Sequence, residues 1–300
     1  MKILYVLDQP NLYGSEQHVL GLIQAMKAYN EVTLLAFDEG PLLQKLRELG
    51  IPFHVILMSW SSVLTVMKLC DFFRKGSYDV IHAHQPKAVF WASIAARLVG
   101  TPCIITIHSL PSSNIQTYRA PLKKCVVGIF HFFVKFSAEI FSSRVIYLSR
   151  FSFRYAAFKK KSLVIPNWLA KLVPDEQICK TYGNPIRLIS VGSVTSNKGM
   201  DRLIDSLSFI KNENWILDII GDCSNDFKLI LSRAAEEYGI KNRIRYLGYK
   251  DNVQDYLLKS DGFILLSRGE TFGLVYIEAM NCGLPIIAWN IPVVHEILSF

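Results

Sequence analysis

The feature that most constrains the fold of this chain is the alternation of short apolar runs with segments of helical periodicity along almost its whole length. We expect strands at residues 3–7, 32–37, 53–57, 80–82, 103–107, 145–148, 163–165, 188–191, 216–220, 244–247, 262–266 and 285–288. Continuous runs of Val, Ile and Leu between helices are typical of parallel strands covered on both faces. The pattern therefore predicts a doubly wound α/β architecture.

The alternation is interrupted once, by a stretch from about residue 166 to residue 185 that contains three prolines and has no clear period. We therefore predict an N-terminal Rossmann-like domain at 1–166, a linker at 167–186 and a second Rossmann-like domain at 187–300. Ligands of such folds bind outside the carboxyl ends of the strands. A ligand shared by two such domains is expected in the cleft that they form.

The composition favours an anionic partner, because the formal net charge is +8 and the pI is about 9.1. Hydrophobic residues make up 51% of the chain, which is enough for sizeable cores. The six cysteines form no Cys-x-x-Cys pair, and most of them lie within apolar stretches, which predicts free, buried thiols in a reducing compartment. We expect no bound metal.

The sequence favours contact with a membrane surface over a segment that crosses the membrane. The N-terminal apolar run stops at Asp8, too early for a signal peptide, and residues 122–141 carry too many charges to span a bilayer. We therefore expect a cytoplasmic protein. Residues 118–161 interleave basic and aromatic side chains, which favours reversible contact with an anionic membrane surface, with packing on the first domain as the alternative. Nucleic-acid binding is not expected, since no recognition module is present.

The strongest candidate site surrounds two carboxylates. The predicted strand 262–266 runs into Glu270, and a helix from about residue 272 to residue 281 carries Glu278. The backbone N–H groups at the start of a helix bind anions, which assigns Thr271, Phe272, Gly273 and Leu274 to a phosphate seat. Gly273 allows a ligand close to the backbone. A phosphate-binding turn next to a carboxylate that accepts hydrogen bonds from hydroxyls is the arrangement expected where a nucleotide-sugar binds.

The segment from Ser267 to Ile287 resembles the Glu-x7-Glu motif of retaining glycosyltransferases of family 4, which have the two-domain GT-B fold. The resemblance implies transfer of a sugar from a nucleotide-diphosphate-sugar, such as a UDP-sugar, to a hydroxyl acceptor, with retention and without a metal or other cofactor. It also implies that Glu270 orients the donor sugar and that Glu278 holds the ribose. The acceptor expected by analogy is a saccharide or lipid-linked intermediate of polysaccharide or lipopolysaccharide synthesis.

Further residues match the family's donor site. Lys198 matches a phosphate-binding lysine, whereas Ser193 stands where the family has an arginine, with Arg268 as a candidate replacement. The resemblance places Gly221 at the cleft and Gly14 near the donor phosphates, where Tyr13 replaces a first glycine.

In the same way, the resemblance places His108 near the donor sugar. His84, expected just beyond a strand, is a weaker candidate for the site, and His82 is expected in the core. Ser15 could simply cap a helix, and Asn167 is expected in a hinge turn. His108, Glu270 and Lys198 are the predicted catalytic residues.

Two other functions stay open. One is a GT-B nucleotide-sugar epimerase, which needs additional carboxylates for proton abstraction. The other is a non-catalytic nucleotide-sugar-binding or scaffold subunit, which Ser193 favours. Family members continue beyond the position that matches residue 300, so we also expect a shortened C-terminal end.

Overall fold

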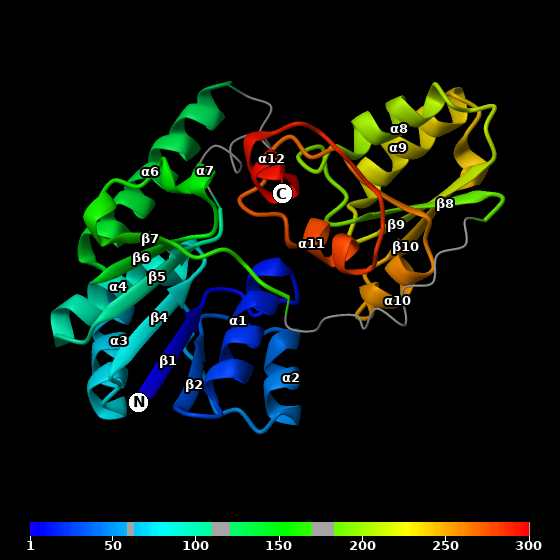
Figure 1. The fold of residues 1–300 in the computed structure, drawn as a ribbon. Helices are drawn as coiled ribbons and strands as arrows, with labels where there is room; N and C mark the ends of the chain where they lie inside the picture. Colours follow the sequence, from blue (N-terminus) through cyan, green and yellow to red (C-terminus); the bar gives the residue numbers. More distant parts are fainter. Residues whose placement is uncertain (59–62, 110–120, 170–182, 300) are drawn as a thin grey trace. The chain divides into compact units, whose positions relative to one another are not determined.

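The computed structural model describes residues 1–58, 63–109, 121–169 and 183–299. The chain divides into two compact units, Met1–Asn167 and Trp168–Phe300. Each unit contains one parallel sheet with helices around it (Figure 1). Most of the predicted linker, together with Cys179, lies outside the described residues.

The first unit contains a seven-stranded sheet in the order β3-β2-β1-β4-β5-β6-β7, and every described pairing in it is parallel. Its strands are β1 (Lys2–Leu7), β2 (Glu31–Ala36), β3 (Phe53–Val55), β4 (Val80–His84), β5 (Cys103–Ile107), β6 (Arg144–Tyr147) and β7 (Ser162–Val164). Its helices are α1 (Gly14–Met26), α2 (Pro41–Glu48), α3 (Val63–Gly76), α4 (Pro86–Val99), α6 (Pro121–Phe141), α7 (Arg150–Phe153) and the 3-10 turn η1 (Lys159–Lys161).

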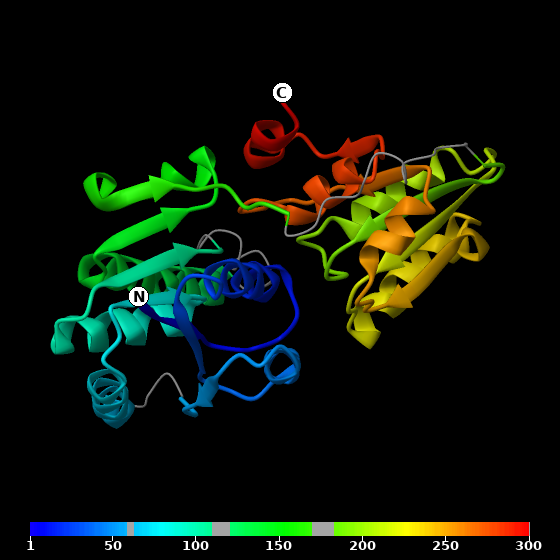
Figure 2. The same cartoon turned by 60° about the horizontal axis from the view of Figure 1, so that its bottom comes forward.

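This sheet is apolar on both faces because successive side chains of a strand point in opposite directions. In β1, Leu4 and Val6 pack with residues of α3, α4 and α6, whereas Tyr5 and Leu7 pack with residues of α1 and α2. Figure 2 shows the same sheet from a second direction. Burial on both faces explains why the strands appear in the sequence as continuous apolar runs.

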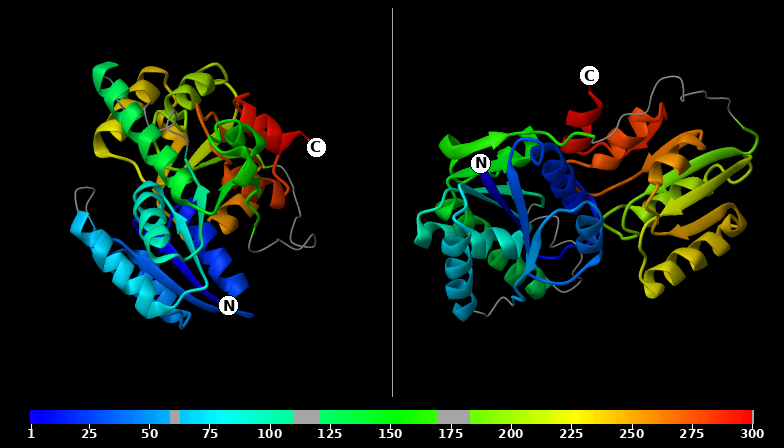
Figure 3. Two further views of the ribbon diagram at one scale, coloured as in Figure 1. Left: turned by 90° about the vertical axis from the view of Figure 1, so that its left-hand side faces the viewer. Right: turned by 90° about the horizontal axis from the view of Figure 1, so that it is seen from below.

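The second unit contains a five-stranded parallel sheet in the order β10-β9-β8-β11-β12 (Figure 3). Its strands are β8 (Ile186–Val191), β9 (Trp215–Ile220), β10 (Ile244–Gly248), β11 (Gly262–Leu265) and β12 (Ile286–Ala288). Its helices are α8 (Met200–Ser208), α9 (Asn225–Glu237), α10 (Val253–Leu258), α11 (Leu274–Asn281), α12 (Pro292–Leu298) and the 3-10 turn η3 (Lys241–Arg243).

The predicted doubly wound α/β architecture is confirmed, and each predicted strand corresponds to an observed one. Three local expectations were wrong. The fourth strand continues to His84 instead of ending at residue 82, and α11 begins at Leu274 rather than near residue 272. The short helices α7 and α12 were missed, because four and seven residues are too few for a periodic pattern.

Candidate functional site

The two predicted catalytic residues of the second unit form a direct ion pair. Nζ of Lys198 lies 2.7 Å from Oε1 of Glu270. The hydroxyl of Ser267 donates a hydrogen bond of 2.7 Å to the same carboxylate oxygen. Glu270 is almost fully buried and Lys198 is partly exposed. The loops that follow β8 and β11 therefore present a cation whose position is fixed by a buried carboxylate.

Two glycines allow close backbone contacts at this edge of the sheet. Gly199 joins the loops after β8 and β11, and Gly221 joins the loops after β9 and β8. Gly199 has a φ of +68°, and a Cβ atom there would lie 1.9 Å from the carbonyl oxygen of Leu266. A Cβ atom on Gly221 would lie 2.0 Å from the carbonyl oxygen of Gly192. Only glycine permits such close backbone approach. Gly221, predicted to contact the donor, thus also has a purely structural reason to be glycine.

The turn before α11 differs from the prediction in one respect. Gly273 has a φ of +84° and caps the helix, while Thr271 and Phe272 precede the helix and are buried. The side chain of Phe272 therefore belongs to the core, and Thr271 and Phe272 can offer a ligand mainly their backbone. Leu274 starts the helix, where backbone N–H groups have no intrahelical partner.

Glu278 lies in the second turn of α11 and is half-buried. Burial raises the pKa of its carboxyl group above the ordinary value of 4.5, because desolvation penalises the charged form. A carboxyl group in this environment gains from hydrogen bonds donated by hydroxyls, which is the property expected of a ribose-binding group.

The arginine expected at position 193 is not replaced by Arg268. The guanidinium of Arg268 is bound bidentately by Asp201, at 2.6 and 2.7 Å, and also donates to the carbonyl oxygen of Ser196. Ser193 itself is exposed. The guanidinium of Arg268, the candidate for this role, is thus already occupied by a carboxylate of α8.

In the first unit, the half-buried His108 lies against the buried imidazoles of His84 and His18. His108 follows β5 directly, and its Nε2 lies 2.9 Å from Nδ1 of His84, the last residue of β4. The ring centroid of His18, from α1, lies 5.0 Å from that of His108. His82 is buried and its Nε2 lies 2.8 Å from the hydroxyl of Thr106, which confirms it as a core histidine.

Burial keeps these imidazoles neutral. Desolvation lowers the pKa of His18 to about 4 and that of His82 to about 3. It also holds the pKa values of His84 and His108 well below the ordinary 6.5, and the neighbouring histidines lower them further. At neutral pH the group therefore offers lone pairs and N–H donors rather than positive charges.

The loop between β1 and α1 is fixed by hydrogen bonds to Gln85, the residue that follows β4. Helix α1 begins at Gly14 without a side-chain cap, so the expectation that Ser15 caps it was wrong. The hydroxyl of Ser15 donates to the buried Glu16, at 2.7 Å. Gln85 donates to Glu16, also at 2.7 Å, and accepts hydrogen bonds from the backbone N–H groups of Asp8 and Gln9.

Gly14 has open space around it, since a Cβ atom there would meet nothing within 4 Å. Packing therefore does not explain this glycine, unlike Gly199 and Gly221. Gln85 and Glu16, which shape the loop, were missed by the sequence analysis. The φ of +69° at Gln85, uncommon for a residue other than glycine, becomes visible only in the structure.

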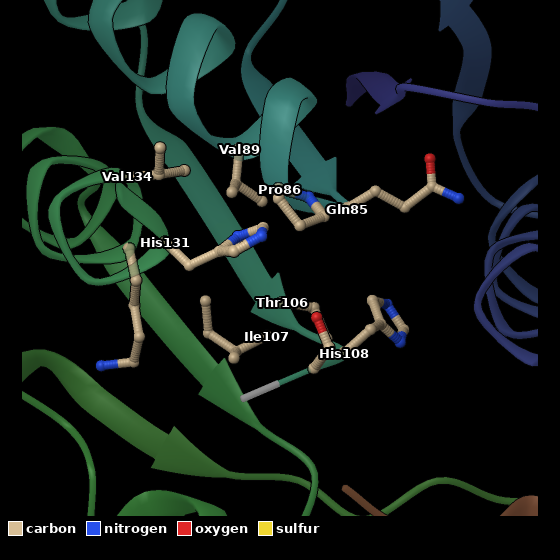
Figure 4. A pocket seen from close by; sticks show the side chains of 10 residues that line it. Gln85, Pro86, Val89, Thr106, Ile107, His108, His131 and Val134 are labelled. Carbon is tan, nitrogen blue, oxygen red and sulfur yellow. The ribbon is translucent and has the colours of Figure 1, made fainter. Parts of the chain in front are cut away.

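A small pocket opens beside His108, between α4, β5 and α6 (Figure 4). It is lined by Pro86 and Val89 of α4, Thr106 and Ile107 of β5, His131, Val134 and Lys135 of α6, and also by Gln85, His108 and Ser109. The ring of His131 points toward Pro86 and Val89. The lining is apolar along α4, whereas α6 contributes the polar His131 and Lys135 beside Val134.

Helix α6 carries the aromatic part of the segment 118–161, of which residues 118–120 lie outside the described range. Its buried face includes Val134 and Ala138, while Phe130, Phe132 and Phe133 are exposed. Among the described helices, none combines the length and the apolar character needed to cross a bilayer.

Comparison with known proteins identifies the family. The profile described as Glycosyltransferase Family 4 matches residues 13–168, and the profile described as Glycosyl transferases group 1 matches residues 175–299. The chain belongs to glycosyltransferase family 4. It is therefore a glycosyltransferase, and the predicted family is confirmed. This membership favours sugar transfer over the epimerase alternative.

Relatives of this family-4 chain act in surface polysaccharide synthesis. It is 26% identical to an Escherichia coli UDP-Gal:alpha-D-GlcNAc-diphosphoundecaprenol alpha-1,3-galactosyltransferase, over 97% of this chain and 80% of the relative. It is 23% identical to the capsular polysaccharide biosynthesis glycosyltransferase CapH of Staphylococcus aureus, over 100% of this chain and 84% of CapH.

Among solved structures, Anabaena HepE in complex with UDP-glucose matches this family-4 chain with a TM-score of 0.82. The two are 21% identical, and the match covers 100% of this chain and 83% of HepE. The likeness extends to WaaG, a glycosyltransferase involved in lipopolysaccharide biosynthesis, with a TM-score of 0.69 and 14% identity over 99% of this chain and 84% of WaaG. The predicted GT-B fold is confirmed.

The structure thus sorts the predicted residues into two groups. In the second unit, Ser193, Lys198, Gly221 and the segment from Glu270 to Glu278 follow the carboxyl ends of β8, β9 and β11. In the first unit, Gly14, His84 and His108 lie at or just beyond the carboxyl ends of β1, β4 and β5. Each group lies where ligands of doubly wound folds bind.

Proposed function

We propose that this chain transfers a sugar from a UDP-sugar to a hydroxyl of a saccharide linked to a lipid diphosphate, with retention at the anomeric carbon and without a metal cofactor. The observation that carries the proposal is the Lys198–Glu270 ion pair at the carboxyl end of the second sheet, next to the start of α11. A relative at 26% identity is named as a galactosyltransferase that uses UDP-Gal, which supports the choice of donor.

The roles follow from charge and position. In the reaction, the bond from the anomeric carbon to the diphosphate breaks, and a bond to the acceptor oxygen forms. Lys198 and the N–H groups at the start of α11 stabilise the negative charge of the leaving diphosphate. Glu270 holds Lys198 in place and orients the donor sugar, and Glu278 accepts hydrogen bonds from the ribose hydroxyls. Lys198 and the N–H groups of α11 supply the positive potential that a metal ion would otherwise provide.

His108 is proposed to contact hydroxyls of the sugar or of the acceptor. The pocket beside it supports this assignment, since it combines an apolar wall from α4 with polar groups from α6 and from the residues around His108. We expect His131→Ala, which changes this pocket, to raise the KM for the acceptor while leaving the KM for the donor unchanged.

The decisive experiment measures release of UDP and formation of product from UDP-hexoses and a polyprenyl-diphosphate-linked N-acetylhexosamine, with EDTA present throughout. We expect turnover in EDTA, an α-anomeric product by proton NMR, and a loss of at least about 100-fold in kcat/KM for Lys198→Ala. Lys228→Ala, a lysine of α9 that is paired with the ring of Tyr246, is the matched control.

Three results would reject the proposal or a part of it. Binding of UDP-sugars without transfer or slow donor hydrolysis would favour the non-catalytic scaffold alternative. A β-linked product, or activity that EDTA abolishes and Mg²⁺ restores, would reject the retaining or the metal-independent part.

We also propose that α6 rests on an anionic membrane. Exposed Phe130, Phe132 and Phe133 lie on this helix, and the basic turn Lys159–Lys161 belongs to the same unit. Apolar insertion combined with basic residues gives reversible surface binding. Phe132→Ser/Phe133→Ser should reduce co-sedimentation with phosphatidylglycerol vesicles, whereas Phe209→Ser, an exposed phenylalanine of the second unit, should not. Equal co-sedimentation of both variants would contradict this.

A further inference from the structure

The histidines at the strand ends of the first unit have the geometry of a metal site. His18, His84 and His108 each offer one ring nitrogen, and these three atoms lie within 4.8 Å of one another. Two of the rings are closer, with 2.9 Å between Nδ1 of His84 and Nε2 of His108. Ligand nitrogens around a tetrahedral Zn²⁺ are about 3.3 Å apart, given Zn–N distances of about 2.0–2.1 Å. Small side-chain movements would therefore place all three around one ion.

The chemical state of the rings suits coordination. Metal-bound imidazole is neutral, and coordination therefore suits a site in which His18 and His84 are buried and His108 is half-buried. His84 is fully buried, and its Nδ1 atom already lies beside Nε2 of His108, so two ring nitrogens from neighbouring strands meet in one place.

The three rings are carried by separate, well-supported elements. His84 ends β4, whose partner strand β5 pairs Thr106 with it and leads directly to His108. His18 projects from α1, and its ring packs against those of His84 and His108, with centroid distances of 5.6 and 5.0 Å. A set of three imidazoles favours Zn²⁺, Ni²⁺ or Cu²⁺ over Mg²⁺ and Ca²⁺.

We propose that His18, His84 and His108 bind one divalent transition-metal ion of the Zn²⁺ class, with a fourth position open to water beside the half-buried His108. The ion is not a cofactor of sugar transfer. Because the proposed function assigns His108 to the sugar or the acceptor, an ion bound here withdraws that ring and inhibits transfer. This second consequence rests on the proposed function, whereas the binding itself does not.

The test titrates the full chain, first freed of metal by a chelator, with Co²⁺ and records its visible absorption. We expect the intense bands of four-coordinate Co²⁺, which Zn²⁺ then displaces. His18→Gln and His84→Gln should each weaken binding at least about 10-fold. His131→Gln, which changes a histidine of the same unit outside the cluster, should bind as the parent chain does.

The proposal is overturned if the parent chain shows no four-coordinate Co²⁺ spectrum, or if His18→Gln binds Co²⁺ as tightly as the parent. The three rings would then be a hydrogen-bonded network only. Circular dichroism checks the folding of each variant, and if His84→Gln does not fold, the His18→Gln comparison decides alone. A normal Co²⁺ spectrum in a chain that shows no transferase activity even in EDTA would reject the proposed function while leaving the metal site intact.

Discussion

At the scale of single residues, glycines in this chain have two different reasons to be glycine. Gly199 and Gly221 are required because carbonyl oxygens of neighbouring loops occupy the space of a Cβ atom. Gly14 has free space around it, so its role is explained better by a ligand that approaches the backbone. Substitution to alanine is therefore expected to reduce stability at Gly199 and Gly221, and to affect ligand binding rather than stability at Gly14.

Gly199→Ala should lower the free energy of unfolding by about 3 kcal/mol or more, because the methyl group adds a clash to an unfavourable φ. Gly239→Ala is the matched control, since Gly239 has a φ of +74° with nothing within 4 Å of its Cβ position. The control should cost only about 1–2 kcal/mol. Urea denaturation measures both, and equal losses would show that the contact with Leu266 is not what requires glycine.

Gly14→Ala should leave thermal stability unchanged or slightly higher, since alanine fits the first turn of α1 and reduces the entropy of the unfolded chain. If the donor approaches this loop, the same variant should lose kcat/KM for the UDP-sugar by about 10-fold or more. Steady-state kinetics beside a melting curve separates the two effects. Unchanged kinetics would remove Gly14 from the donor site.

At the scale of elements, a buried carboxylate joins α6 to the rest of the first unit. Glu139 accepts hydrogen bonds from the hydroxyl of Tyr147, at 2.7 Å, and from the backbone N–H of Ala157, at 2.9 Å. Nζ of Lys135 pairs with the same carboxylate. A helix with an exposed aromatic face is thus held in place by a polar anchor on its other side.

Glu139→Ala should destabilise the first unit by about 3–5 kcal/mol, because it leaves the largely buried Lys135 without its counter-charge. Tyr147→Phe, which removes one hydrogen bond, should cost only about 1 kcal/mol. Glu236→Ala removes the exposed pair with Lys241 and should change stability by less than about 1 kcal/mol. Calorimetry of the three variants gives the order, and a loss for Glu139→Ala as small as for Glu236→Ala would contradict the anchor.

A second element-scale prediction concerns acid. Burial alone would raise the pKa of Asp201, but the hydrogen bonds and the charge of Arg268 outweigh it and hold the pKa below the ordinary 3.8. A carboxyl group with a lowered pKa in the folded state stabilises the fold above its ordinary pKa. That contribution is lost as the pH falls through the lowered value.

Arg268→Ala should therefore make the stability of the second unit depend less on pH below about pH 5. Arg233→Ala, which changes an exposed arginine of α9, should keep the pH dependence of the parent. Urea midpoints between about pH 3 and pH 7 measure the difference. A parent-like pH profile for Arg268→Ala would show that Asp201 does not depend on this arginine.

At the scale of the whole molecule, the chain is two units with separate cores and separate groups of candidate residues. The proposed diphosphate site belongs to the second unit and the histidine group to the first. A ligand that binds only a folded unit stabilises that unit by mass action. The division therefore predicts which substitutions alter the response to UDP.

UDP at about 100 times its Kd should add about 2.7 kcal/mol to the stability of the unit that binds it. The resulting shift in Tm should be lost in Lys198→Ala. It should persist in Glu139→Ala, although that variant starts from a lower Tm, because Glu139 lies in the first unit. Differential scanning calorimetry with and without UDP tests this, and an undiminished shift in Lys198→Ala would place the diphosphate elsewhere.

The amino-acid pattern was sufficient for the architecture, because strands buried on both faces must be continuously apolar, and helices between them must be amphipathic. It was also sufficient for the Glu270–Glu278 segment, whose residues are local in sequence. Folding alone brought together groups that lie far apart along the chain: Lys198 with Glu270, Arg268 with Asp201, and His18 with His84 and His108. Parallel strands return to the same edge only after a crossover, so the contacts at that edge join distant residues and leave no local pattern.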